Sequence, residues 1–466
     1  MSHQKCMANS YLRPPSLLPV SGKRVTEQNR RSFMQAGSLS LGMSAAGLSG
    51  LNLPSILRAE DKQGIGSSHK SLIQIFLAGG PPHLDLWDLK PNAPSEIRGE
   101  FSPIPTSASG VQISEVFPKL SQWMHRGSLI RSIVGSKDQH DAFQCLSGWK
   151  PEDLRSIGGR PSMGSVVSKV QGPVDPSVPA FVGLAEKSTH REWSDCGGPG
   201  FLGAAHSAFR PDGPALENMT LHGLPLERLR DRRKLLVSLD TLRRDIDTSG
   251  VMAGMDAFSQ RALDVLTSSK LVEALDLSRE DPEIVAKYGD GKPYQHQFDG
   301  TATRNDHLLI ARRLIEAGVR VVSLSFGRWD AHTNNTAMVR DHAGKLDQCL
   351  SALIEDLEQR GMLDDVSIVV WGEFGRTPKI NKDGGRDHWP QVNSAFLVGG
   401  GMRGGQVIGA TNRLGECVVE RPVDVQEVVA TLYHNMGIST AHTALQDPTG
   451  RPQFLVDRDP IRELIS

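Results

Sequence analysis

Residues 301–397 alternate between short apolar runs and helical segments, and this alternation limits the possible folds more than any other feature. A helix is expected over about Asn305–Ala317, closed by Gly318, a residue suited to helix ends. The apolar run 319–325 follows, then a helix over about 337–360, and then the run Val366–Trp371. Strand, helix, strand in this order predicts parallel pairing through a right-handed crossover. The near-continuous Val, Ile and Leu of both runs indicate strands buried on both faces.

Further runs extend the same predicted sheet. Residues 72–77, 128–134 and 394–398 are apolar and short enough to be strands, while residues 114–125 and 142–148 have helical spacing. We therefore expect an α/β protein with a mostly parallel sheet flanked by helices. Apolar residues recur at three- and four-residue intervals in residues 215–286. This stretch is interpreted as a helical insertion, about 215–290, that covers one face of the sheet or offers a surface to a partner.

The first 60 residues differ in character from the rest. Arg30 and Arg31 precede a Ser-Phe-Met triplet, and a weakly apolar stretch rich in Gly, Ser and Ala follows over residues 36–57. This order is typical of an export leader, and the arginine pair resembles the bacterial twin-arginine signal. We expect residues 1–60 to be a leader and linker, residues 70–460 to fold, and the twin-arginine export machinery to deliver a periplasmic or otherwise extracytoplasmic protein. A disordered basic tail is the alternative.

Several partner classes are disfavoured by composition. Lys plus Arg total 52 and Asp plus Glu total 53, so no overall positive field would attract nucleic acid. The apolar stretch near the N-terminus is short and interrupted by Gly, so a stable membrane span is not expected. The five cysteines lack CxxC spacing, which argues against a thiolate metal site. No phosphate-binding GxxxxGK[ST] loop occurs.

Acidic and imidazole side chains lie next to each predicted strand. In an open parallel sheet, ligands bind beyond the carboxyl ends of the strands, so these side chains should meet at one edge. Carboxylates brought close together repel unless protons or cations intervene, and Asp, Glu and His are suitable ligands for divalent metals. The candidate metal ligands are Asp85, Asp330, His332, Glu373, Asp387 and His388.

Each candidate also has a purely structural interpretation. Asp330 and His332 could belong to a polar loop with a hydrogen-bonded imidazole. Glu373 could form an ion pair with Arg376, and Asp85 could have a structural role.

Seven segments resemble a known family. They are AGGPPHLDLWDLKP, FPKLSQWMHRGSLIRSI, QHDAFQCLSGW, LDLSREDPEIVAKYG, WDAHTNN, VVWGEFGRTPKIN and GGRDHWP. They are similar to segments of the planctomycete-type exported proteins of the domain-of-unknown-function 1501 family, which looks like a branch of the alkaline phosphatase and sulfatase superfamily. The resemblance implies an alkaline-phosphatase-like fold with a metal pair at the strand ends that hydrolyses phosphate or sulfate esters.

Residue by residue, the resemblance is partial. Asp330 and His332 match the superfamily's Asp and His well, and His388 could be its late single His. Glu373 stands where an Asp-His pair is usual, and Asp85 is the nearest substitute for an early metal Asp. The nucleophile position falls near Asp138, where no Cys or Ser stands.

Two functions follow from these observations. The first is a metal-dependent hydrolase of a small-molecule or polysaccharide phosphate or sulfate ester. A divalent ion (Zn, Mn, Ca or Mg) would lower the pKa of bound water to about 7. Arg376 or Arg386 would stabilise developing charge, and His140 would be a general acid or base. The second is a non-catalytic exported binding or structural protein on the same scaffold, suggested by the missing nucleophile and by the helical insertion.

Overall fold

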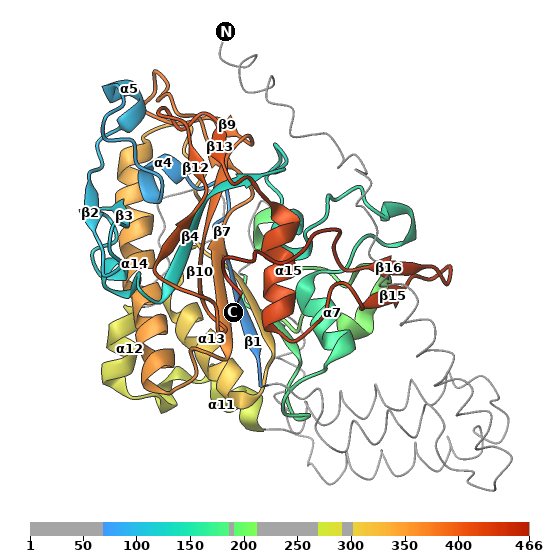
Figure 1. The fold of residues 1–466 in the computed structure, drawn as a ribbon. Coiled ribbons are helices and arrows are strands. Elements are labelled where there is room, and N and C mark those ends of the chain that lie inside the picture. The colour runs from blue at the N-terminus through green and yellow to red at the C-terminus, as the bar shows by residue number, and fades with distance from the viewer. Residues whose placement is uncertain (1–68, 186–190, 212–268, 291–301, 466) are drawn as a thin grey trace, which may run out of the picture. The chain divides into compact units, whose positions relative to one another are not determined.

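An eight-stranded sheet forms the centre of the computed structural model (Figure 1). Side by side, its strands are β11 (Gln406–Ile408), β4 (Gly127–Val134), β10 (Asn393–Gly399), β7 (Val366–Trp371), β1 (Ser71–Phe76), β6 (Val321–Ser325) and β5 (Phe181–Gly183), with β14 (Val423–Asp424) also paired to β4. The structure describes residues 69–185, 191–211, 269–290 and 302–465. The predicted leader, and residues 215–268 of the predicted insertion, lie outside these ranges.

Strand direction explains how the sheet gathers side chains at one edge. β1 pairs in parallel with β6 and β7, β5 with β6, and β11 and β14 with β4, whereas β10 is antiparallel to both β4 and β7. The predicted mostly parallel α/β sheet is confirmed. Because β10 runs in the opposite direction, it begins at the edge where its neighbours end. Residues just before β10 therefore meet residues that follow β4, β6 and β7.

One detail of the predicted topology was wrong. β6 and β7 run parallel, as the strand-helix-strand pattern indicated, but they do not pair with each other because β1 lies between them and pairs with both.

Helices cover both faces of the sheet. They are α4 (His83–Leu86), α5 (Ser95–Arg98), α6 (Phe143–Ser147), α7 (Met163–Val170), α11 (Ser269–Leu275), α12 (Pro282–Tyr288), α13 (Asn305–Ala317), α14 (Asn335–Gln359) and α15 (Val425–Asn435). Short two-stranded sheets are formed by β2 (Pro103–Pro105) with β3 (Gln112–Ser114), β8 (Gly375–Arg376) with β9 (His388–Trp389), β12 (Ala410–Thr411) with β13 (Val418–Glu420), and β15 (Ala444–Gln446) with β16 (Pro452–Phe454). Single 3-10 turns are η2 (Leu120–Trp123), η3 (Arg155–Ile157), η4 (Arg191–Ser194), η5 (Gly200–Leu202), η6 (Ala204–His206) and η7 (Leu277–Arg279).

Successive residues of the central strands face two separate cores. Ile73 and Ile75 of β1 pack in the core formed with α13 and α14, whereas Leu72 and Phe76 pack in the core formed with α6, α7 and α15. Figure 1 shows the two helical layers on opposite sides of the strands. The period-two alternation of buried apolar residues on both faces is what the continuous apolar runs predicted.

The described part of the predicted insertion adds to one of these layers. α11 packs against α13, and α12 packs against both α13 and α14. Among the described residues, no helix combines the length and the apolar character needed to cross a membrane.

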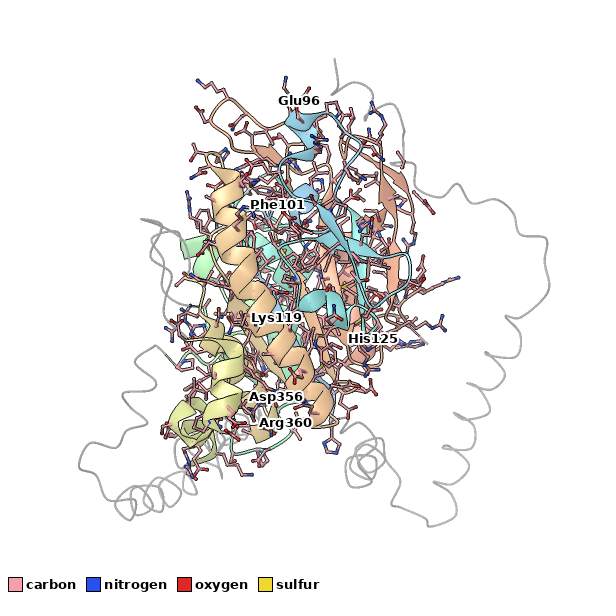
Figure 2. The ribbon with its side chains drawn as sticks, turned by 90° about the vertical axis from the view of Figure 1, so that its left-hand side faces the viewer. Glu96, Phe101, Lys119, His125, Asp356 and Arg360 are labelled. Carbon is pink, nitrogen blue, oxygen red and sulfur yellow. The ribbon has the colours of Figure 1, made fainter. Side chains whose placement is uncertain are left out.

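The helix predicted over residues 114–125 is absent. β3 ends at Ser114, and only the single 3-10 turn η2 forms, beyond Pro118. Asp347 of α14 instead accepts the backbone N–H groups of Lys119 and Leu120 at 3.1 and 2.7 Å, which fixes this loop to the helix surface. Figure 2 shows Lys119 beside α14, and Asp356 and Arg360 toward the C-terminal end of that helix.

Candidate metal centre

The Oδ1 atom of Asp330 is the point on which the candidate site converges. The Nε2 atoms of His332, His140 and His388 lie 3.0, 3.4 and 3.8 Å from it, and Nη2 of Arg376 lies 2.5 Å from it. Asp330 and His332 follow β6, and His140 follows β4. Arg376 and His388 are paired partners in the two-stranded sheet of β8 and β9. Four separate segments of the chain therefore meet at one carboxylate oxygen.

In each of the three imidazoles, the Nδ1 atom contacts a separate carboxylate, while the Nε2 atom faces Asp330. The Nδ1 contacts are His140 to Glu373 at 2.8 Å, His332 to Asp387 at 2.8 Å, and His388 to Asp138 at 2.7 Å. A carboxylate oxygen accepts, so Nδ1 is the donor in each pair, and Nε2 is the ring nitrogen that faces the centre. Histidines that bind metals are typically oriented in this way by a second carboxylate.

The inward-facing atoms are close enough to share one ion. One donor atom each from His140, Asp330 and His388 lies within 4.8 Å of the others, and Nε2 of His332 is 3.2 Å from Nε2 of His388. Imidazole nitrogens suit Zn, Fe, Ni or Cu, whereas Ca and Mg prefer oxygen ligands. The donor set of two imidazoles and one carboxylate, with the His332 imidazole beside it, thus fits a transition-type divalent ion better than Ca or Mg.

Opposite charges stabilise each other between Asp330 and His140. Burial raises the pKa of Asp330, but hydrogen bonds from His140 and His388 and the charge of Arg376 outweigh burial and hold that pKa far below its usual range. Burial lowers the pKa of His140, but Asp330 and Glu373 outweigh it and raise the pKa to about 9. Asp330 is therefore ionised under ordinary conditions, and the two carboxylates, Asp330 and Glu373, favour positive charge at the position of His140.

Glu373 is a buried carboxylate next to the centre, with only one of its oxygens bonded to described residues. Its side chain is only 2% exposed, and its Oε1 atom accepts hydrogen bonds from the N–H of Gly79 at 2.9 Å and from His140. Its Oε2 atom is buried and has no hydrogen-bond partner among the described residues. A buried carboxylate oxygen in this condition is usually satisfied by an ion or an ordered water.

The turn after β1, at Gly79 and Gly80, packs closely against the residues of the site. Gly79 has φ of +104°, and a Cβ atom there would lie 2.6 Å from the backbone nitrogen of Asp330. The carbonyl oxygens of Gly79 and Gly80 accept hydrogen bonds from Arg376. The superfamily pattern expects a metal Asp directly after this strand, and here the turn instead supplies backbone groups that hold Glu373 and Arg376.

Asp85 does not join the centre, contrary to the sequence-based prediction. Its two oxygens lie 2.8 and 2.9 Å from Nε and Nη2 of Arg386, and it also accepts a hydrogen bond from Asn335 at 2.7 Å. Among the described residues, the group of donors able to hold an ion does not include Asp85. Its buried oxygens are already satisfied by the guanidinium.

The two predicted anion-stabilising arginines are both fully buried. Arg386 donates to Asp85 and to the carbonyl oxygens of residues 97, 377 and 378, so all five of its N–H groups are used. It therefore has no donor left for a substrate, and the prediction for Arg386 is corrected. Arg376 bonds Asp330 and three backbone carbonyls, which indicates a positioning role for this residue.

His140 was predicted as a general acid or base. Its Nε2 atom instead faces Asp330 Oδ1, in the group of candidate metal ligands. Glu373 and Asp387, predicted as ligands, contact the Nδ1 atoms of His140 and His332.

Two residues of the site were missed from the sequence. Asp138, which follows the second predicted strand and lies near the missing nucleophile but was not predicted as a ligand, holds His388. Arg328 has its Nη2 atom 3.5 Å from Oδ2 of Asp330. Arg328 lies two residues before Asp330, a spacing that places both side chains on one side of an extended chain, whereas bends at residues 138 and 139 remove this rule for Asp138. That spacing was the available signal for Arg328.

Cys145 is not placed to act as a nucleophile. Its Sγ atom donates to the carbonyl oxygen of Gly372 at 3.3 Å, and burial raises the pKa of its thiol well above the usual value. A reactive cysteine needs accessible thiolate, so this residue packs in the core.

Fold and site together define the class: an α/β protein with a histidine- and aspartate-rich candidate metal centre at the strand ends. The chain belongs to the family described as "Protein of unknown function (DUF1501)", whose model matches residues 69–465. The resemblance stated from the sequence motifs is thereby confirmed. No curated protein matches this chain.

Solved structures similar to this chain include enzymes of the sulfatase and alkaline phosphatase type. The PsFucS1 sulfatase from Pseudoalteromonas sp. is 13% identical, with 82% of this chain and 70% of that chain covered and a TM-score of 0.35. The phosphonate monoester hydrolase SpPMH from Silicibacter pomeroyi is 12% identical, with 79% and 73% covered and a TM-score of 0.32. A TAB5 alkaline phosphatase mutant with Mg bound is 8% identical, with 80% and 99% covered and a TM-score of 0.32. At these TM-scores the similarities carry no conclusion about activity, which is inferred from the site itself.

Proposed function

We propose that this protein is a metal-dependent hydrolase of phosphate or sulfate esters, with the ion held by Asp330, His140, His388 and His332. One observation carries the proposal: the Nε2 atoms of three histidines surround one oxygen of Asp330, while each Nδ1 atom is bound to a separate carboxylate. A purely structural cluster of polar loops has no need for three Nε2 atoms directed at one carboxylate oxygen. An ion site does.

The charges of the site favour one divalent ion. When the imidazoles are neutral, as binding to an ion requires, four carboxylates (Asp138, Asp330, Glu373 and Asp387) and two guanidinium groups (Arg328 and Arg376) leave two negative charges uncompensated. One divalent ion balances these charges, and a metal pair would exceed them. The imidazole-rich donor set favours Zn or another transition ion over Ca or Mg.

The chain's own residues would prepare the site in two ways. Arg376 keeps Asp330 ionised and fixes it to the turn after β1. The rings of Phe374 and Trp193 lie with their centroids 5.1 and 5.0 Å from that of His140, which restricts the imidazole and shields it from solvent. A divalent ion at such a site can lower the pKa of bound water to about 7 and so provide a nucleophile that the side chains do not supply.

Elemental analysis of the purified full-length chain tests the metal. We expect about one Zn or related ion per chain, retained by the wild type and lost in Asp330→Asn and His388→Asn. His125→Asn is a matched control, because His125 is exposed and its Nδ1 bonds Ser107 outside the site. Hydrolysis of 4-nitrophenyl phosphate and 4-nitrophenyl sulfate tests the reaction. A protein that binds no ion, and stays inactive with Zn, Mn, Mg and Ca, contradicts the proposal.

A metal-binding protein without catalysis is the second candidate. It is favoured by the burial of Cys145, which leaves the segment around residues 138–148 without an accessible thiol. A chain that retains its ion and releases no product from either ester would support a binding or structural role, with the ion holding the four segments together.

We also propose that twin-arginine export delivers the protein to an extracytoplasmic compartment. The proposal is supported by Arg30 and Arg31 followed by a mild apolar stretch. Replacing both arginines by Lys should retain the chain in the cytoplasm of a bacterial host, as measured by cell fractionation. Unchanged export of that variant would contradict this route.

A further inference from the structure

Arg328 is the arginine of the site that solvent can reach. Its side chain is 22% exposed, whereas those of Arg376 and Arg386 are 0% exposed. Its Nη2 atom lies 3.5 Å from Oδ2 of Asp330, while the imidazoles gather around Oδ1. Arg328 therefore places a positive charge beside the donor cluster, on the other oxygen of the same carboxylate.

A buried tryptophan fixes the position of this guanidinium. The Cζ atom of Arg328 lies 5.6 Å from the centre of the Trp193 ring, and Trp193 is only 1% exposed. The rings of Trp193 and His140 meet edge to face, with an interplanar angle of 87°. The backbone oxygen of Trp193 accepts a hydrogen bond from Ser325 in β6 at 2.7 Å. One anchored side chain thus supports both a proposed ligand and the neighbouring cation.

The distance between Arg328 and Asp330 leaves the guanidinium less tightly engaged there than Arg376 is. A charge-assisted hydrogen bond is typically about 2.7–2.9 Å long. The Arg376 contact to Asp330 is 2.5 Å, and the Arg328 contact is 3.5 Å. A planar guanidinium presents paired donors that match the oxygens of phosphate and sulfate, and at 5.6 Å from the Trp193 ring centre its charge lies within cation-π range.

We propose that Arg328 forms a binding subsite for a tetrahedral oxyanion, and so makes the site select anionic phosphate or sulfate esters over neutral esters. This inference rests on the proposed function, and it adds the residue that sets the charge of the substrate. Arg376 and Arg386 do not fill the role because their guanidinium groups are fully buried.

Binding of inorganic phosphate and inorganic sulfate to the full-length chain, measured by calorimetry with and without zinc, tests the subsite directly. Arg328→Gln should weaken anion binding at least about tenfold, the loss expected for one charge-assisted contact, and should leave the zinc content unchanged. Arg328→Lys keeps the charge but lacks the planar guanidinium, so its anion affinity should lie between those of the wild type and Arg328→Gln. Arg155→Gln removes an exposed arginine from η3, outside the site, and should bind like the wild type.

Steady-state kinetics supply the second readout. Arg328→Gln should raise KM for 4-nitrophenyl phosphate or sulfate and leave KM for the neutral 4-nitrophenyl acetate unchanged. Wild-type anion affinity in Arg328→Gln, loss of zinc from that variant, or a zinc-loaded wild type that binds neither anion would each overturn the inference. Anion binding that depends on Arg328 in a protein that hydrolyses no ester would uphold the subsite and reject only the proposed reaction.

Discussion

Oδ1 of Asp138 lies 2.7 Å from Nδ1 of His388, joining two segments that are 250 residues apart in the sequence. Asp138 belongs to the loop after β4, and His388 begins β9 just before the antiparallel strand β10. The Asp138 side chain is 59% exposed. This contact therefore contributes little to the stability of the fold, and its consequence is the direction in which the imidazole points.

Asp138→Asn should weaken metal binding without unfolding the protein. The amide no longer carries the charge that holds the Nδ1 proton, so His388 loses both basicity and orientation. Loss of such an outer carboxylate typically reduces metal affinity about 10–100-fold. Competition with a zinc chelator measures the affinity, and thermal unfolding of the metal-free protein should be almost unchanged.

The matched control for that variant is Asp365→Asn. Asp365 is similarly exposed, at 53%, and pairs with Lys70 instead of with a histidine. Equal zinc affinity in both variants would show that the Asp138 contact does not orient a ligand.

Gly79→Ala should disturb both the fold and the site. Gly79 has φ of +104°, and the added Cβ would lie 2.6 Å from the nitrogen of Asp330. Gly110 also has positive φ, +76°, but nothing lies within 4 Å of its Cβ position. Gly110→Ala should cost about 1–2 kcal/mol, the price of left-handed backbone alone.

Gly79→Ala should cost at least about 2 kcal/mol more than Gly110→Ala, and it should also lower zinc affinity because Asp330 must move. Urea unfolding gives the stabilities, and chelator competition gives the affinities. Similar behaviour of the two variants would mean that the turn after β1 does not support the site.

The spacing of apolar residues along the sequence predicted several strands and the loops that follow them. The helix predicted at Asn305–Ala317 and the strand predicted at Val366–Trp371 have the same bounds in the structure. Both are decided by short-range spacing of apolar residues. Since the strand ends define the binding edge of such a sheet, the loops carrying Asp330, His332 and His388 could also be named.

Pairing across the chain could not be predicted. Nothing local indicates that β1 separates β6 from β7, or that Asp85 pairs with Arg386 across 301 residues. The difference between a residue that faces the ion and one that supports a histidine depends on side-chain direction. Sequence spacing does not specify which nitrogen of His140 meets Glu373.

His83 should make stability fall as pH is lowered. It is fully buried, and burial, partly offset by Asp88, lowers its pKa from 6.5 to about 4. Between pH 6.5 and 4 the unfolded chain therefore binds a proton that the folded chain does not. Stability from this group is fully present above pH 6.5 and declines by about 3 kcal/mol on lowering the pH to about 4.

Urea unfolding of the wild type and of His83→Gln at pH 7 and pH 4.5 isolates this effect. Glutamine does not titrate, so the variant should lose less stability between the two pH values, whatever its stability at pH 7. An identical pH dependence in the two proteins would show that His83 is protonated as readily in the folded state as in the unfolded state.

Arg386→Met should act through stability and not through substrate binding. The guanidinium and Asp85 are 0% and 1% exposed, and removing one member of a buried ion pair typically costs about 3–5 kcal/mol because the other charge is left unpaired. The double variant Asp85→Leu with Arg386→Met removes both charges and should recover part of the loss. Urea unfolding measures this coupling, and KM for 4-nitrophenyl phosphate, compared with Arg328→Gln, separates the two arginines. A raised KM with unchanged stability in Arg386→Met would restore this residue to the anion-stabilising role predicted from the sequence.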